Sequence, residues 1–311
     1  MNIIHIGNFG HGWDGSLCDE LHISNALQEL GHTVVNIQRE NWSKRLTEDN
    51  NHVWHPHPTF ILLAQWDGFP DYFIDTIRDC YSGVPIIFWC YDYQADGQEW
   101  HERLIKGADL YLSKRIADSK YPNWQWLSQD FAPTFLDKVD DPVGEPIDVL
   151  FTGSYLPWAT ERNDILKAVD DKFNLVIHSV TPAQWKELGF KNVYGPLMDD
   201  ELPNLIARAK INLSIDHTIE SGYWSDRNAQ IMACGGYVLF RYVPLSETVF
   251  GAGVDYFYDK EGCIKKIEQA IDAPSYRQFV SRIGYETATY LNRLRVDGRV
   301  YDLLTIVGSI L

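Results

Sequence analysis

Residues 2–38 read NIIHIGNFGHGWDGSLCDELHISNALQELGHTVVNIQ and contain the pattern that decides the fold class. An apolar run at 2–7 ends in a glycine-rich loop, and apolar residues then recur at helical spacing up to Gly31, a residue type that often follows a helix. The run HTVVNIQ (32–38) predicts a second strand. Strand, glycine loop, helix and strand in this order open a doubly wound α/β sheet. The loop lacks a G-x-G-x-x-G spacing, so a dinucleotide-binding fingerprint is not supported.

The same plan begins again in the second half of the chain. IDVLFTGS (147–154) predicts a strand that runs into a glycine turn, and helical patterns then alternate with apolar runs such as FNLVIHS (173–179) and INLSID (211–216). Between the halves, residues 133–147 carry three prolines and several acids, which is typical of a linker. We therefore predict an α/β protein with two Rossmann-like domains facing a cleft, with ligands at the carboxyl ends of the strands.

Composition and charge limit the possible classes of function. The 311 residues are 45% hydrophobic and 23% charged, as in globular proteins of two ordinary domains. A net charge of −16 argues against a broad nucleic-acid-binding surface, which needs clustered Lys and Arg. We see no signal peptide and no apolar run near the roughly 18 residues of a membrane span. The five cysteines show no paired spacing, so we expect reduced thiols and a cytoplasmic protein.

Three stretches of the second half carry a family resemblance. They are GPLMDDELPNLIARAKINLSIDH (195–217), RNAQIMACGGYVLF (227–240) and PLSETVFGAGVDYFYDKE (244–261). Together they resemble the nucleotide-sugar domain of GT-B glycosyltransferases of the group 1, CgeB-like type. The resemblance covers most of residues 147–290 and extends more weakly over the N-terminal half.

The resemblance implies a division of the chain and an activity. It implies an acceptor-binding Rossmann-like domain at 1–140, a nucleotide-sugar-binding Rossmann-like domain at 146–275, and C-terminal helices at 276–311 that pack back toward the N-terminal domain. It further implies a hexosyl- or pentosyltransferase that moves a sugar from a nucleotide-diphosphate donor to a hydroxyl acceptor, with no metal and no other cofactor. For the acceptor, a small molecule, a glycan or a protein is favoured over a modified DNA base. Two alternatives stay open: a non-catalytic nucleotide-sugar-binding protein, and a nucleotide-sugar epimerase of the same two-domain plan.

The expected donor site is centred on the start of a helix at about residues 226–234. The resemblance places the signature arginine of the family at Arg227, whose guanidinium can hold phosphate oxygens through two parallel hydrogen bonds. Ser225 or Asp226 is expected to cap this helix. The alternative for Arg227 is an ion pair with Asp226 or Glu220 on a solvated face.

Gln230 stands where the family has a glutamate that accepts hydrogen bonds from ribose hydroxyl groups. A glutamine keeps one carbonyl acceptor, loses the charge and adds a donor. The other expected donor-binding residues flank the predicted strand ends and helix starts, where an ordinary structural role is the alternative for each; they are Gly153, Ser154, Arg162, His178, Ser179, Asp216 and Asn228. Of these, the His178–Ser179 pair is expected to hold the edge of a nucleobase through backbone groups.

The catalytic candidates lie in the N-terminal half. Asp92 follows the apolar run VPIIFWCY and is the first choice for a base that deprotonates the acceptor in an inverting reaction. His11 and Asp14, in the first glycine loop, are the second choice. The alternative for each is a loop polar group without chemistry. The segment HVWHPHP (52–58) holds three histidines but no cysteine or acid at ligand spacing, so we expect no metal site there.

Overall fold

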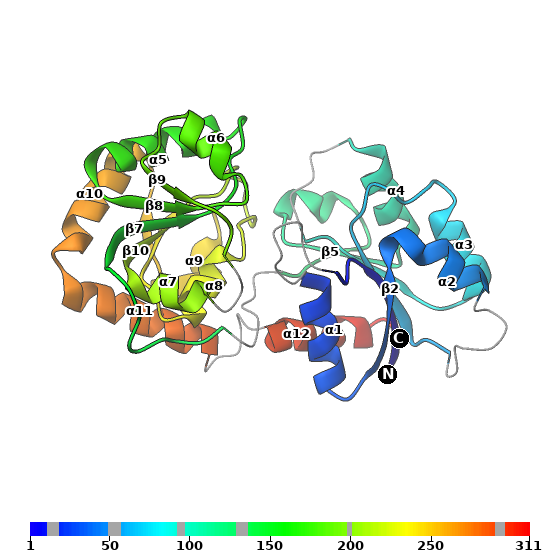
Figure 1. Ribbon diagram of the computed structural model, residues 1–311. Coiled ribbons are helices and arrows are strands. Elements are labelled where there is room, and N and C mark those ends of the chain that lie inside the picture. The colour runs from blue at the N-terminus through cyan, green and yellow to red at the C-terminus, as the bar shows by residue number, and fades with distance from the viewer. Residues whose placement is uncertain (11–18, 49–56, 92–96, 129–135, 198–200, 290–295) are drawn as a thin grey trace. The chain divides into compact units, whose positions relative to one another are not determined.

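The computed structural model of the chain describes residues 1–10, 19–48, 57–91, 97–128, 136–197, 201–289 and 296–311. The described residues fall into two compact units (Figure 1). The first comprises the described residues up to 128 together with 299–311, and the second comprises those between 136 and 298.

The first unit contains a six-stranded parallel sheet in the order β2-β1-β3-β4-β5-β6. Its strands are β1 (Asn2–Gly7), β2 (Thr33–Gln38), β3 (Phe60–Ala64), β4 (Ile86–Trp89), β5 (Leu110–Ser113) and β6 (Trp124–Trp126). Its helices are α1 (Asp19–Glu29), α2 (Trp42–Glu48), α3 (Phe73–Cys80) and α4 (Glu99–Gly107), with the 3-10 turns η1 (Arg39–Asn41) and η3 (Ile116–Lys120). All residues of β3 and β4 are buried, which explains their continuous apolar sequences.

The second unit contains another six-stranded parallel sheet, in the order β12-β11-β10-β7-β8-β9. Its strands are β7 (Ile147–Thr152), β8 (Leu175–His178), β9 (Asn192–Tyr194), β10 (Ala209–Ser214), β11 (Val238–Arg241) and β12 (Asp255–Phe257). Its helices are α5 (Thr160–Lys172), α6 (Pro182–Glu187), α7 (Leu202–Arg208), α8 (Arg227–Ala233), α9 (Ser246–Phe250), α10 (Lys260–Ile271) and α11 (Pro274–Thr289), with the 3-10 turn η4 (Gly251–Gly253). The predicted fold class, two Rossmann-like parallel sheets, is confirmed.

Helices cover both faces of the second sheet. Successive residues of β7 point to opposite faces, as in any strand: Val149 and Phe151 join one buried cluster and Leu150 joins the other. The first cluster is completed by α5, α6 and α10, and the second by α7, α8 and α11 (Figure 1).

The order of strands in the second sheet reverses at β7. The chain builds β8 and β9 outward on one side of β7 and then crosses to build β10, β11 and β12 on the other side. In an open parallel sheet, ligands bind outside the carboxyl ends of the strands at such a reversal. The residues that follow β7 and β10 therefore occupy the position where a ligand is expected.

The last two helices belong to different units. Our sequence-based division placed all of residues 276–311 with the N-terminal half, but α11 packs on α8 and η4 within the second unit. This packing is close because Gly284 of α11 meets Gly253 of η4, and a Cβ built on Gly284 would lie 2.9 Å from the Gly253 carbonyl oxygen. Helix α12 (Val296–Gly308) follows, and residues 299–311 belong to the first unit.

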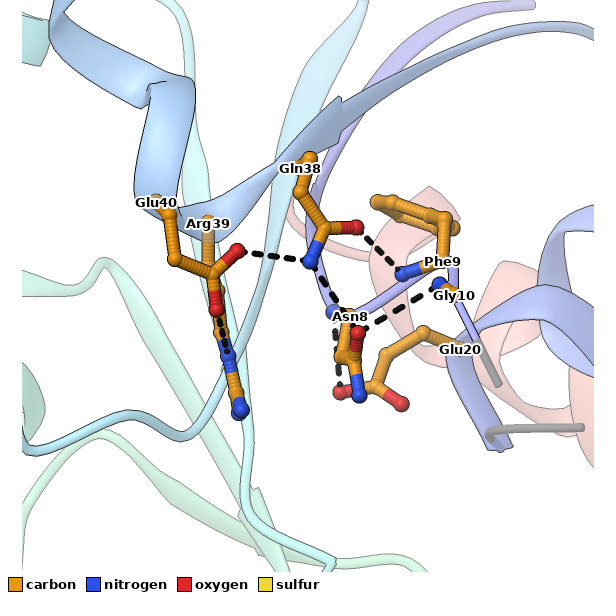
Figure 2. A network of polar contacts seen from close by, with 7 residues as sticks. All are labelled: Asn8, Phe9, Gly10, Glu20, Gln38, Arg39 and Glu40. Atoms are coloured by element: carbon orange, nitrogen blue, oxygen red, sulfur yellow. Dashed lines mark hydrogen bonds and ion pairs between the residues drawn. The ribbon is translucent and has the colours of Figure 1, made fainter. Parts of the chain in front are cut away.

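Side chains at the carboxyl end of β1 tie the following loop to β2 (Figure 2). Gln38 accepts a 2.8 Å hydrogen bond from the Phe9 backbone N–H through Oε1, and its Nε2 donates to Asn8 Oδ1 at 3.0 Å and to Glu40 Oε2 at 2.6 Å. The Asn8 backbone N–H donates to Glu20 Oε1 at 3.3 Å. These bonds determine the path of residues 8–10 as the chain leaves the first sheet.

The contact between α11 and η4 predicts an unusual response to alanine. In an exposed helix interior, Gly→Ala stabilises by about 1 kcal/mol. We expect Gly284→Ala to lower the free energy of unfolding instead, by about 1–3 kcal/mol, because its Cβ would overlap the Gly253 carbonyl. Urea denaturation measures the change. Gly308→Ala, where a Cβ meets nothing within 4 Å, is the matched control and should not destabilise. Equal effects of the two substitutions would show that the glycine contact is unimportant.

His5 predicts how stability responds to acid. Its ring is fully buried with Nδ1 2.8 Å from Ser24 Oγ, and burial lowers its pKa from 6.5 to about 3. Since the unfolded chain binds this proton near pH 6.5 and the folded chain does not, the contribution is complete above pH 6.5 and is lost as the pH falls toward 3. The slope is up to about 1.4 kcal/mol per pH unit.

The variant His5→Asn should therefore lose less unfolding free energy than the wild type between about pH 7 and pH 5. Urea titrations of both proteins at the two pH values measure the difference. The same pH dependence in both proteins would contradict a buried neutral His5.

Candidate functional site

Two arginines lie together at the carboxyl edge of the second sheet, beside the reversal of strand order. Arg227 begins α8, and its Nε donates a 2.7 Å hydrogen bond to the Thr152 carbonyl at the end of β7. Arg162 lies in the first turn of α5, and its Nη2 donates to the Ser154 carbonyl at 2.7 Å. Both guanidinium groups lie over the buried ring of Phe151, at 5.1 Å for Arg227 and 5.8 Å for Arg162. We call Arg162 and Arg227 the arginine pair.

The arginine pair carries more positive charge than its surroundings neutralise. The pKa of Arg162 is lowered to about 10, first by burial and then by the positive charge of Arg227, while Asp216 opposes the shift. Asp216 Oδ1 lies 4.0 Å from Arg227 Nη1 and accepts a 3.1 Å hydrogen bond from the Ser225 backbone N–H. One carboxylate beside two guanidinium groups leaves an excess positive charge, which suits an anionic ligand.

A glycine makes room for this arrangement. A Cβ built on Gly153 would lie 3.1 Å from Arg227 Nη2 and 3.0 Å from Phe151 Cζ. Any larger residue would push the guanidinium away from the Phe151 ring. The predicted glycine turn after β7 therefore positions Arg227.

The alternative partners considered for Arg227 are not the ones that the structure supplies. Its ion pair is with Asp216 rather than with Asp226 or Glu220, and its side chain is only 15% exposed rather than on a solvated face. Its Nη1 also donates to Ser225 Oγ at 3.3 Å. The expected acid partners were chosen for nearness in sequence, whereas Asp216 reaches Arg227 from the end of the neighbouring β10.

The predicted side-chain cap of α8 is wrong. Asp226 occupies the N-cap position but already has helical backbone angles (φ −66°, ψ −15°), and its side chain makes no capping hydrogen bond. A capping residue normally has an extended backbone that turns its side chain onto the first free N–H groups. The Asp226 carboxylate instead accepts a 2.6 Å hydrogen bond from Gln230 Nε2.

His178 and Ser179 follow β8, but the backbone groups between them are already used. The His178 carbonyl accepts from the Gly153 N–H at 3.0 Å, and the Ser179 N–H donates to the Tyr194 carbonyl at 3.2 Å. The His178 ring is stacked on Tyr194, with ring centres 5.2 Å apart, and burial lowers its pKa. Ser179 Oγ accepts a 3.2 Å hydrogen bond from Trp185 Nε1 and is 97% buried. What this pair offers a ligand is therefore the half-exposed ring of Tyr194 rather than its own backbone.

Asn228 lies away from the ligand-accessible surface. Its side chain is completely buried on the core side of α8, and neither amide atom has a hydrogen-bond partner. Of the predicted donor-binding residues, the structure brings Gly153, Ser154, Arg162, Asp216 and Arg227 together, while Gln230 joins them through Asp226. We have no physical account of the unpartnered Asn228 amide.

Arg162 and Asp216 also line a pocket of about 220 Å³ above β10. Sequence analysis did not select three of its other lining residues, Trp158, Glu161 and Arg241. A signal was present for one of them: Arg241 places a charge at the end of the otherwise apolar strand VLFR. We call this cavity the β10 pocket; its lining residues are Trp158, Ala159, Thr160, Glu161, Arg162, Ile215, Asp216, His217, Thr218, Ile219 and Arg241.

The three catalytic candidates, His11, Asp14 and Asp92, lie outside the described residues. Tyr91, which precedes Asp92, is 5% exposed, and its pKa is raised well above the usual value by burial and by the nearby acids Glu20 and Asp19. Tyr91 is therefore a neutral, buried phenol at the carboxyl end of β4.

Two further searches concern the described part of the chain alone. Among these residues, no group of three or more His, Cys, Asp and Glu side chains is placed to hold a metal ion. Within the same residues, every helix is too short or too polar to cross a membrane.

Comparisons with known proteins give the fold its name. Residues 162–304 match a family model described as glycosyl transferase-like. No curated protein matches the chain. Among solved structures, sucrose-phosphate synthase from Thermosynechococcus elongatus has a TM-score of 0.70 at 13% identity, covering 99% of this chain and 98% of that one.

Two glucosyltransferase-related structures are also similar. The T4 phage protein BGT in complex with UDP-glucose has a TM-score of 0.66 at 13% identity, covering 98% of this chain and 99% of its own. An α-glucosyltransferase in complex with UDP and a 13-mer DNA has a TM-score of 0.64 at 12% identity, covering 99% of both chains. At such low identity the likeness is one of fold: the two sheets form the GT-B glycosyltransferase fold.

Proposed function

We propose that this protein is a metal-independent glycosyltransferase that takes its sugar from a UDP-type donor held by the second unit. The observation that carries the proposal is the arginine pair on Phe151, because it concentrates positive charge at the strand reversal where this fold class binds ligands. The glycosyl transferase-like match over residues 162–304 begins at Arg162 and includes Arg227. A CgeB-like subtype and a cytoplasmic location belong to the same proposal.

The arginine pair would stabilise the leaving diphosphate. When the bond between the sugar carbon and the phosphate oxygen breaks, negative charge grows on the diphosphate, and donors already fixed in place stabilise that charge without reorganising. Arg227 and Arg162 are fixed in this sense, because each also donates to a backbone carbonyl, Thr152 and Ser154 respectively. In this way they would supply the charge that a divalent cation supplies elsewhere.

Gln230 would serve the ribose through its carbonyl oxygen. Asp226 can only accept hydrogen bonds when ionised, so the 2.6 Å contact assigns the Gln230 amide nitrogen to that side. The Gln230 carbonyl then remains as an acceptor for a hydroxyl group. The Asp226 carboxylate, one helical turn away, supplies the negative charge that the glutamine lacks.

The acceptor would be activated by the N-terminal half. Asp92 remains our first choice for the base that takes the acceptor proton, followed by His11 and Asp14. In that step the acceptor oxygen bonds to the sugar carbon, the carbon–phosphate oxygen bond breaks, and the proton passes to the base. Glu20 is a further carboxylate at this edge, 92% buried and bonded to the Asn8 N–H.

The acceptor class is proposed from charge. One similar structure contains DNA, but residues 1–128 of this chain hold nine Lys and Arg against 17 Asp and Glu, a net charge of −8. DNA binding draws most of its affinity from cations placed against phosphates. A hydroxyl group on a small molecule, a glycan or a protein is therefore favoured over one on a DNA base.

The arginine pair predicts the first binding test. UDP should raise the melting temperature of the wild-type protein, and Arg227→Gln should weaken UDP binding by about tenfold to a hundredfold, since a charged hydrogen bond is worth about 1.5–3 kcal/mol. Titration calorimetry with UDP measures both proteins. Arg282→Gln is the matched control, since Arg282 is 67% exposed on α11. If both variants bind UDP as the wild type does, the arginine pair is not the diphosphate site.

Turnover separates the proposal from its two alternatives. A transferase given UDP-glucose without an acceptor should slowly release UDP and glucose, and Arg162→Met should reduce that release because it removes charge from the leaving-group site. Coupled detection of UDP measures the rate. Binding without any release from a panel of nucleotide sugars would favour the non-catalytic binding protein. Interconversion of the intact nucleotide sugar, seen by chromatography, would instead favour the epimerase.

A further inference from the structure

The β10 pocket adjoins the arginine pair but is not filled by the role proposed for it. It shares Arg162 and Asp216 with that site and extends away from Arg227 toward the end of β11. At about 220 Å³ it is smaller than the roughly 300–1,000 Å³ of pockets that hold a whole ligand. It therefore suits one group of a larger ligand.

Arg241 gives this pocket a cation whose counter-ion can be exchanged. The Arg241 side chain is only 10% exposed, and its ion pair is with Glu161, 2.8 Å from Arg241 Nη1. The Glu161 side chain is 62% exposed, so most of its surface is still in water. A buried guanidinium needs an anion, whereas an ion pair with so exposed a partner contributes little stability. A ligand carboxylate could therefore replace Glu161 at small cost.

Two polar atoms in the pocket wall are buried without partners. Arg162 Nε is a donor and Asp216 Oδ2 is an acceptor, and neither has a hydrogen bond among the described residues. Native proteins rarely leave such atoms unsatisfied unless a ligand or water completes them. A ligand rich in hydroxyl groups suits both, because a hydroxyl donates and accepts.

The rim of the pocket is apolar and exposed. Trp158 is 69% exposed and Ile219 is 46% exposed, although both are large hydrophobic residues. An exposed tryptophan beside a polar pocket offers a flat face for the C–H side of a sugar ring.

We propose that the β10 pocket holds a sugar ring that carries a carboxylate, a uronic acid, with the carboxylate on Arg241 in exchange for Glu161. The inference rests on the proposed function, and it names the class of sugar. The ring hydroxyls meet Arg162 and Asp216, and the ring face lies on Trp158. The uronic acid belongs either to the nucleotide donor or to the acceptor, and the test below distinguishes these sources.

The test compares the affinities of the full-length protein for UDP-glucuronate, UDP-glucose and UDP by titration calorimetry. The wild type should bind UDP-glucuronate at least about tenfold more tightly than UDP-glucose, since a charged hydrogen bond exceeds 1.4 kcal/mol. Glu161→Gln should widen this ratio, because it removes the competing carboxylate. Arg241→Gln should bring the ratio close to one and leave the affinity for UDP unchanged.

Two variants and one further ligand keep the result decisive. Glu161 is on the surface, so Glu161→Gln tests the exchange even if Arg241→Gln fails to fold, and Arg241→Lys retains the charge at the same position. Free glucuronate added to the UDP-loaded protein locates the source: saturable binding that Glu161→Gln strengthens, with no preference between the two UDP-sugars, assigns the uronic acid to the acceptor.

Other outcomes overturn the inference. If neither UDP-glucuronate nor free glucuronate is preferred, or if Glu161→Gln leaves every ratio unchanged, the β10 pocket does not bind a uronic acid, although UDP binding still supports the proposed function. Absence of UDP binding overturns the proposed function and the inference together.

Discussion

The second unit depends on placing two like charges against one aromatic ring. The guanidinium groups of Arg162 and Arg227 repel each other, which is one reason why the pKa of Arg162 falls to about 10. Three interactions offset that repulsion: the electron-rich face of Phe151, the two backbone carbonyls at the end of β7, and the nearby Asp216. The offset is incomplete, and the residual positive charge is what an anionic ligand would neutralise.

This arrangement needs the sheet around it. Phe151 is fully buried between β7 and the helices α5 and α6, so its ring cannot move away from the arginines. Thr152 and Ser154 present their carbonyls because β7 ends there in a glycine turn, and Asp216 arrives from β10 on the other side of the strand reversal. Each contributor comes from a different segment of the chain. The reversal of strand order is what brings the segments to one edge.

The carboxylates of this edge act through partners that they can exchange or share. Asp226 does not cap α8 but holds the amide of Gln230, so that a substituted residue keeps an oriented acceptor. Glu161 neutralises the buried Arg241 from a largely exposed position. Both pairs leave a hydrogen-bonding group directed toward a ligand rather than locked into the core. This is the behaviour expected where binding, and not stability, has determined the choice of residues.

The sequence by itself determined the two α/β sheets, because fully buried parallel strands require continuous apolar runs such as those at 60–64 and 86–89, and these are visible without coordinates. It also pointed to Arg162, Asp216 and Arg227 from their places at strand ends and helix starts. Only the tertiary structure decided which of them meet, that Asn228 faces the core, and that Arg241 shares a pocket with residues from α5 and β10. The physical reason is that strand order sets which ends are neighbours. Periodicity along the chain reports which residues are buried and carries no information about which strand lies beside which.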